Sequence, residues 1–179
     1  MRMGASESIL SLQRTVEMFS EGGIMLAKHY VMKTGVGASE SALVSFDKAL
    51  LNSGVGNYNL VRLSSILPAK CQKVGKVDLT EGSLLPTAYS TISSNNLGDI
   101  LVSVIGVGFP VNKDKVGVIM EYSAIGKTAN EAVDILKNMI VEAFETRNWA
   151  LDRIELDYAS AVVDKKNETK TTFACIAEW

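Results

Sequence analysis

A run of ten almost wholly apolar residues, 100–109, constrains the fold of this chain more than any other segment. Ile100, Val102 and Val104 alternate with smaller partners, and the run is rich in β-branched residues and glycine. This pattern is typical of a half-buried central strand. The run is much shorter than the roughly 20 residues that a membrane span needs. We therefore expect a strand within a globular domain.

Two amphipathic helices are predicted. The better-defined one begins at Thr128, which forms a capping-box pattern with Glu131. The apolar residues that follow at helical spacing predict one buried face: Ala132, Val133, Leu136, Met139, Ile140, Ala143 and Phe144. A shorter helix is predicted over residues 45–52, with Ser45 as its N-cap. Its predicted buried face consists of Phe46, Ala49 and Leu50.

Strand patterns fill most of the remaining chain. They cover residues 24–33, 60–63, 84–93 with a break at Pro86, 117–122, 149–157 and 171–179. Residues 34–39 are predicted to form a small-residue turn, and residues 164–168 a solvated hairpin tip. Because strands outnumber helices, we expect a mostly antiparallel or mixed sheet that two helices cover. The predicted fold class is an α+β layered sandwich.

The length and composition of the chain limit the functions that it can have. A chain of 179 residues fits one domain, 1–179, with residues 1–23 as an N-terminal helical arm. The net charge of −2 and the scattered lysines disfavour nucleic acid and anionic membranes as partners. Cys71, Cys175 and a single histidine do not suit a zinc or iron site, so no metal is expected. We expect a cytoplasmic protein with two buried, reduced cysteines.

Residues 54–68 are the stretch where chemistry is most plausible. Gly54 and Gly56 permit tight turns, a short strand follows, and two adjacent hydroxyls, Ser64 and Ser65, come next. A serine hydroxyl beside a backbone carbonyl can attack that carbonyl. A second pair, Ser93 and Ser94, is predicted to lie in a polar loop. The serine pair alone is therefore not diagnostic.

Two carboxylates stand out near these segments. Glu121 is the odd residue in the apolar strand predicted over residues 117–122. It is either a solvated strand end or a partly buried proton donor, and the residues alone favour the first. Asp47 lies near the start of the predicted short helix, where it could favour the helix dipole or bind a ligand. The residues alone favour the structural role.

Residues 45–68, SFDKALLNSGVGNYNLVRLSSILP, resemble the pyruvoyl-dependent arginine decarboxylases. The resemblance continues in order and spacing through residues 81–89, 117–122 and 147–155, and covers most of the chain after His29. It implies an αββα sandwich. It also implies that the proenzyme cleaves itself between Ser64 and Ser65, which gives a small chain, 1–64, and a large chain, 65–179. Ser65 would become a covalent pyruvoyl group, with no pyridoxal phosphate and no metal.

The resemblance also implies roles in catalysis. The pyruvoyl ketone would form a Schiff base with L-arginine and act as electron sink while CO2 leaves, giving agmatine for polyamine synthesis or acid resistance. Glu121 would protonate the Cα carbanion. Asn59 would orient the processing centre, and the carboxylate of Asp47 would bind the substrate guanidinium.

The same resemblance implies homo-oligomers, either trimers of cleaved chain pairs or dimers of trimers, with active sites shared between subunits. Two alternatives stay open. The chain could be a pyruvoyl decarboxylase for another amino acid, such as histidine, because one fold can serve several side chains. It could also be a non-catalytic trimeric scaffold that never matures.

Overall fold

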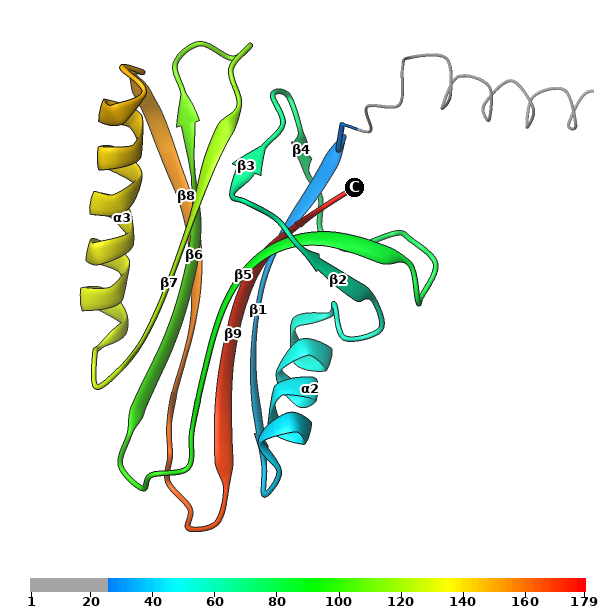
Figure 1. Cartoon of the computed structure of the whole chain (residues 1–179), viewed down its shortest axis with the longest axis vertical. Helices are drawn as coiled ribbons and strands as arrows, with labels where there is room; N and C mark the ends of the chain where they lie inside the picture. The colour runs from blue at the N-terminus through cyan, green and yellow to red at the C-terminus, as the bar shows by residue number, and fades with distance from the viewer. Residues whose placement is uncertain (1–25) are drawn as a thin grey trace, which may run out of the picture.

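Two β-sheets pack face to face between two helices in the computed structural model, which describes residues 26–179 (Figure 1). The arm predicted over residues 1–23 lies outside this range. Helix α2 (Ala42–Ser53) covers the outer face of one sheet, and helix α3 (Ala129–Thr146) covers the outer face of the other. The predicted α+β sandwich is confirmed, with its layers in the order α, β, β, α.

The two sheets draw their strands from distant parts of the chain. Sheet A contains, in spatial order, β2 (Asn59–Arg62), β5 (Leu84–Ser94), β9 (Thr169–Glu178), β1 (His29–Ser39) and β4 (Gln72–Lys73). Sheet B contains β3 (Ile66–Leu67), β7 (Gly117–Ile125), β6 (Ile100–Pro110) and β8 (Leu151–Val162). Neighbouring strands are antiparallel, except that β1 pairs with β4 and β2 with β5 in parallel. The expectation of mostly antiparallel or mixed sheets is confirmed.

Strand β6 is central, as predicted, but it is buried on both faces rather than one. Ile105 and Val107 pack in the core between the sheets, whereas Val102 and Val104 pack beneath α3. The alternation of side chains along a strand thus supplies two different cores. A third cluster, around Phe173, lies between sheet A and α2.

Helix α3 confirms the sequence prediction. Thr128 is its N-cap, and the reciprocal capping box with Glu131 is present. The backbone and side-chain hydrogen bonds from Thr128 hold the pKa of the Glu131 carboxyl below its usual value. Ala132, Leu136 and Ile140 are fully buried on the predicted face.

The predicted turn at residues 34–39 is wrong, because β1 runs straight through it to Ser39. Its glycines serve packing. A Cβ on Gly35 would come within 2.1 Å of the Ala49 carbonyl oxygen, and one on Gly37 within 1.9 Å of the Ser45 carbonyl oxygen. The missing side chains let α2 lie directly on the strand.

Ser45 is not the N-cap of the short helix. That helix begins three residues earlier, at Ala42, with Ser41 at the N-cap position. Ser45 is fully buried, donates a hydrogen bond to the Gly37 carbonyl at 3.1 Å, and shares one with the Thr171 hydroxyl. Its hydroxyl therefore connects α2 to sheet A. From the sequence alone, a serine with this long-range role cannot be distinguished from an N-cap serine.

Three strand predictions also need correction. Strand β5 is continuous through Pro86. Proline is tolerated there because the pairing of β5 with β9 begins only at Thr87, so the prolyl nitrogen, which cannot donate a hydrogen bond, is not needed for that pairing. Strand β7 continues beyond residue 122 to Ile125. The polar loop 164–168 is not a hairpin tip, since β8 and β9 lie in different sheets and the loop crosses between them.

Among residues 26–179, no helix is long and apolar enough to cross a membrane. Cys175 is buried and Cys71 is half-buried, and neither forms a disulfide. Burial raises the pKa of the Cys71 thiol to about 11 and that of Cys175 to about 12. Both are therefore protonated, weakly reactive thiols.

Candidate active site

The Ser64-Ser65 pair forms the bridge between the two sheets. Strand β2 ends at Arg62 in sheet A, and β3 begins at Ile66 in sheet B. Packed sheets lie about 10 Å apart, and a fully extended chain covers about 3.5 Å per residue. The few residues of this bridge must therefore be nearly extended to span the distance between the sheets.

Both ends of the bridge are held by backbone hydrogen bonds. The Leu63 amide donates to the Thr87 carbonyl in β5 at 3.1 Å, and the Ser65 carbonyl accepts from the Ile119 amide in β7 at 2.9 Å. Between them Ser65 has a φ of 77°, in the left-handed region. That conformation costs a non-glycine residue about 1–2 kcal/mol. The bond between Ser64 and Ser65 thus precedes a strained residue at a fixed position.

The hydroxyls of the pair are not used by the fold. Ser64 is exposed and Ser65 half-buried, and no hydrogen bond to either hydroxyl occurs within residues 26–179. No described residue fixes the orientation of either hydroxyl. The Ser65 Oγ is therefore available as a nucleophile toward the neighbouring carbonyl carbon.

Glu121 lies in the middle of β7 rather than at its end. It is two residues beyond Ile119, the partner of Ser65, so the two positions are about 7 Å apart along the strand. Glu121 is cross-strand from Ile105 and shares its face, which looks toward sheet A. The predicted acid and the serine pair are thus brought to one place.

The two carboxylate oxygens of Glu121 differ sharply. Oε1 accepts a hydrogen bond from Nη2 of Arg62 at 2.6 Å. Oε2 is buried and has no hydrogen-bond partner among the described residues. A buried acceptor without a donor is costly. Such an oxygen suits a site that awaits a proton or a substrate donor.

Arg62 is the residue that the sequence prediction missed. Its guanidinium stacks 4.6 Å from the centroid of the Tyr89 ring and donates to the Tyr89 carbonyl at 3.2 Å. The hydrogen bond with Glu121, more than the Coulomb attraction, raises the pKa of Arg62 above its ordinary value. The only signal in the sequence is a lone charge that ends a short apolar strand, and the partner is 59 residues away.

Asn59 is not placed at the serine pair in this chain. It opens β2, where its Nδ2 donates to the Gly82 carbonyl at 2.6 Å and its backbone amide to the Ser83 carbonyl at 2.9 Å. These bonds fix the turn before β5 to the start of β2. The structure thus gives Asn59 a role in shaping the strand that leads to the Ser64-Ser65 bridge.

Asp47 is also apart from the other candidates. It is exposed on α2, and its carboxylate forms no hydrogen bond or ion pair with the rest of residues 26–179. Sheet A lies between α2 and the sheet that contains β7, the strand of Glu121 (Figure 1). The helix begins at Ala42, so Asp47 is beyond the first turn and the predicted helix-dipole role is wrong.

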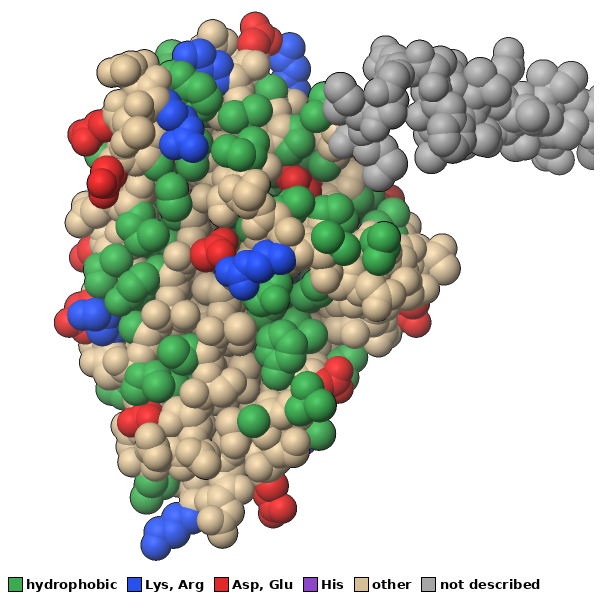
Figure 2. Space-filling view, in the orientation of Figure 1, with side chains coloured by type: hydrophobic (Ala, Val, Ile, Leu, Met, Phe, Trp, Pro, Cys, Tyr) green, Lys and Arg blue, Asp and Glu red, His purple; other side chains and the backbone are tan. Residues whose placement is uncertain are grey.

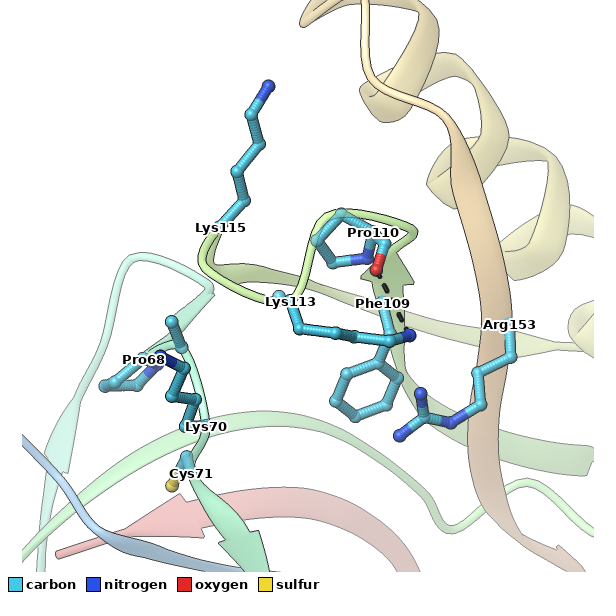
Figure 3. Close-up of a pocket in the computed structure, with 10 residues that line it drawn as sticks. Pro68, Lys70, Cys71, Phe109, Pro110, Lys113, Lys115 and Arg153 are labelled. Carbon is cyan, nitrogen blue, oxygen red and sulfur yellow. Dashed lines mark hydrogen bonds between the residues drawn. The ribbon is translucent and has the colours of Figure 1, made fainter.

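A small cavity of about 130 Å³ lies beyond the far end of β3, and none of the predicted site residues lines it (Figure 3). Its basic side chains already have partners: Lys70 pairs with Asp114, Lys113 with Asp152, and Arg153 with Asp152 and Glu155. Lys115 points away from the other labelled side chains and stacks on Trp149. This cavity is therefore not the centre of the chemistry.

Comparison with known proteins gives the class first. The chain is 42% identical over 120 residues to a pyruvoyl-dependent arginine decarboxylase of Methanococcus maripaludis, covering 67% of this chain and 73% of the relative. It is 40% identical over 146 residues to the one of Methanocaldococcus jannaschii, covering 81% and 86%. For Methanococcus aeolicus the identity is 37% over 145 residues, with the same two shares. These relatives are decarboxylases, and this chain is an enzyme of that class.

A sequence model of the family "Pyruvoyl-dependent arginine decarboxylase (PvlArgDC)" matches residues 29–178. The chain belongs to the pyruvoyl-dependent arginine decarboxylase family. The match spans every helix and strand described above, including the serine bridge and Glu121. The resemblance seen in the sequence is confirmed.

Proposed function

We propose that this protein cleaves itself between Ser64 and Ser65 and then converts L-arginine to agmatine and CO2. One observation carries the proposal: a strained Ser65, whose hydroxyl bonds to none of residues 26–179, bridges the sheets beside the strand that bears Glu121. Family membership supplies the pyruvoyl group as the reactive centre. The arginine substrate rests on the names of the relatives.

Maturation consumes Ser65. Its Oγ attacks the Ser64 carbonyl carbon, the amide C–N bond breaks, and the nitrogen takes up a proton, which leaves an ester. Loss of the Cα proton then expels the Ser64 carboxylate and leaves dehydroalanine at position 65. Its imine tautomer is hydrolysed by water to a ketone and ammonia. The left-handed φ of Ser65 favours this sequence, because cleavage relieves the strain.

The residues around the bridge fit such a group. The buried Oε2 of Glu121 lacks a partner, and a pyruvoyl group at residue 65 would lie at the register position beside Ile119. The group would supply an electrophilic ketone for Schiff-base chemistry with the substrate amine and an electron sink for decarboxylation. Glu121 then delivers a proton from its carboxyl to the substrate Cα.

Asp47 would act on a neighbouring copy. Sheet A separates it from Glu121 within one chain, so its carboxylate can meet the substrate guanidinium only across an interface. The exposed face of α2 supports such an interface, because apolar Leu43, Val44 and Leu51 surround Asp47 on it. Hydrophobic side chains are spread over the α2 and β5 side of the molecule (Figure 2). We propose a trimer, or a dimer of trimers.

The two fragments should remain one folded unit. The small fragment would contribute β1, α2 and β2, and the large fragment all the other described elements. Strand β1 lies between β9 and β4 of the large fragment and pairs with β9 from Tyr30 to Ser39. Backbone cleavage at the bridge leaves these contacts intact.

Intact mass and substrate assays test the proposal. The proposal is supported if the chain is found as two fragments divided after Ser64 and if CO2 is released from arginine rather than from histidine, ornithine, lysine or aspartate. CO2 release from a neutral or acidic substrate alone would overturn the arginine assignment. A full-length chain with no activity would instead identify a non-maturing scaffold.

A further inference from the structure

We infer that Arg62 is the positioning residue of Glu121: it binds Oε1 and leaves Oε2 as the one oxygen that exchanges a proton during the reaction. This inference rests on the proposed function of Glu121 as the proton donor. It gives the small fragment an indirect part in the proton transfer, because Arg62 lies on the N-terminal side of the proposed cleavage bond.

The Arg62 side chain is 56% exposed, but several contacts hold its guanidinium in place. Its Nη2 lies 2.6 Å from Glu121 Oε1, and the same nitrogen reaches the Tyr89 carbonyl at 3.2 Å. The Tyr89 ring supports the guanidinium by a cation–π contact at 4.6 Å. Strand β2 places the backbone of Arg62 by parallel pairing with Thr87. Three separate contacts therefore fix the cation at the carboxylate.

The chemistry of proton donation explains why a cation belongs there. When Glu121 gives up a proton from Oε2, its carboxylate must bear a full negative charge in a partly buried site. Arg62 is permanently charged and stabilises that product of the transfer. It therefore strengthens Glu121 as an acid and orients it, although Arg62 itself need not touch the substrate.

The other described groups near Glu121 do not replace the Arg62 cation. Two further titratable groups lie in this region: Tyr89, which contacts the Arg62 guanidinium, and Asp157 of β8. Asp157 is cross-strand from Ile105, and thus about 10 Å from Glu121 across two strand spacings. Arg62 is the cation that the described residues bring to this carboxylate.

Three variants test the inference: Arg62→Gln, Glu121→Gln and the double variant. We expect Arg62→Gln to lower kcat for arginine roughly tenfold to hundredfold, with KM changed little, when activity is counted per cleaved chain. The basic limb of its kcat–pH profile should move to higher pH, because a carboxyl without its cation stays protonated longer. Arg62→Lys should restore the limb but only part of kcat.

The double variant and a matched arginine separate positioning from folding. If Arg62 acts through Glu121, adding Arg62→Gln to Glu121→Gln costs no further activity, whereas a purely structural role gives additive losses. Arg153→Gln is the control, because Arg153 also stacks on an aromatic ring, Phe109, and pairs with carboxylates. It should leave kcat and the pH profile unchanged.

The outcomes are distinguishable. A wild-type chain that is cleaved and active, with an unshifted pH profile in Arg62→Gln, overturns the role of Arg62 and leaves the proposed function intact. An uncleaved or inactive wild-type chain overturns the proposed function itself. A shifted profile with non-additive losses supports both.

Discussion

The two Ser-Ser pairs of this chain have the same residues and opposite environments. Ser93 and Ser94 end β5, where they pair in register with Thr171 and Lys170 of β9. Their hydroxyls bond to the Thr171 hydroxyl and to a carboxylate oxygen of Asp99. The prediction of a loop there is wrong, because the pair still belongs to the strand. Both of its hydroxyls have a structural partner.

Ser64 and Ser65 differ on each count. They join two sheets, Ser65 has a left-handed φ, and their hydroxyls have no partner among the described residues. The two pairs thus differ in environment and not in sequence, and we propose that the reactivity of Ser64-Ser65 comes from the bridge that the fold holds nearly extended. Two carboxylates repeat the contrast. Glu121 and Glu178 each have a buried Oε2 without a hydrogen-bond partner among residues 26–179, but only Glu121 lies beside the bridge.

The largest effect should come from Ser65→Ala. Without the Oγ nucleophile the chain cannot form the ester, so we expect no cleavage and no decarboxylation, which denaturing electrophoresis and CO2 release will measure. Ser94→Ala is the matched control and should mature normally. Fragments from Ser65→Ala would refute the assignment of the nucleophile.

Glu121→Gln should have the next largest effect. Loss of a general acid lowers turnover by about 10²–10⁴-fold, while the amide keeps the shape of the side chain and permits folding. Steady-state kinetics per cleaved chain provides the measurement. Glu178→Gln, which alters the other unpartnered carboxylate, should retain activity. Equal losses in both variants would show that burial alone, and not position, matters.

Asp47→Asn should raise KM for arginine by roughly tenfold to hundredfold, because the guanidinium loses a charged partner. Cleavage should be unaffected. Asp134→Asn changes an equally exposed helical carboxylate on α3 and serves as control. Co-expression of Asp47→Asn with Ser65→Ala chains should restore activity if sites are shared between copies, and no restoration would place the site within one chain.

Glu178 should affect stability rather than chemistry. Burial raises the pKa of its carboxyl from 4.5 to about 7, so the folded state favours the protonated form. Its stabilising contribution is complete below pH 4.5 and is lost as the pH rises through about 7. Thermal unfolding between these pH values should show this loss in the wild type and much less of it in Glu178→Gln. The same slope in both proteins would contradict the assignment.

Local patterns in the sequence predicted the elements whose causes are local. The capping box of α3 and its apolar stripe are contained in the helix itself, and β6 is recognisable from its own composition. Gly35 and Ser45 misled the prediction because their roles depend on packing between β1 and α2. The alternation in β8 and β9 likewise carries no record of which sheet each strand joins.

The candidate site shows the same division between local and long-range causes. The residues alone drew attention to the serine pair, Glu121 and Asp47, but they favoured structural roles for both carboxylates and left the serine pair undiagnostic. The catalytic roles of Ser65, Glu121, Asn59 and Asp47 came from the resemblance. Arg62 was not predicted because its role depends on a contact with Glu121, which is 59 residues away in the sequence. The sheet-to-sheet bridge was equally invisible, because β2 and β3 are short and neighbouring in sequence but belong to different sheets.

Intact mass spectrometry of the purified wild-type chain is the most direct test of the bridge as the source of the reactive group. We expect two fragments, one that ends at Ser64 and one that begins at residue 65. The second should be lighter, by one molecule of ammonia, than a fragment that begins with serine. A single full-length chain, or a large fragment that retains an N-terminal serine, would contradict the proposed maturation.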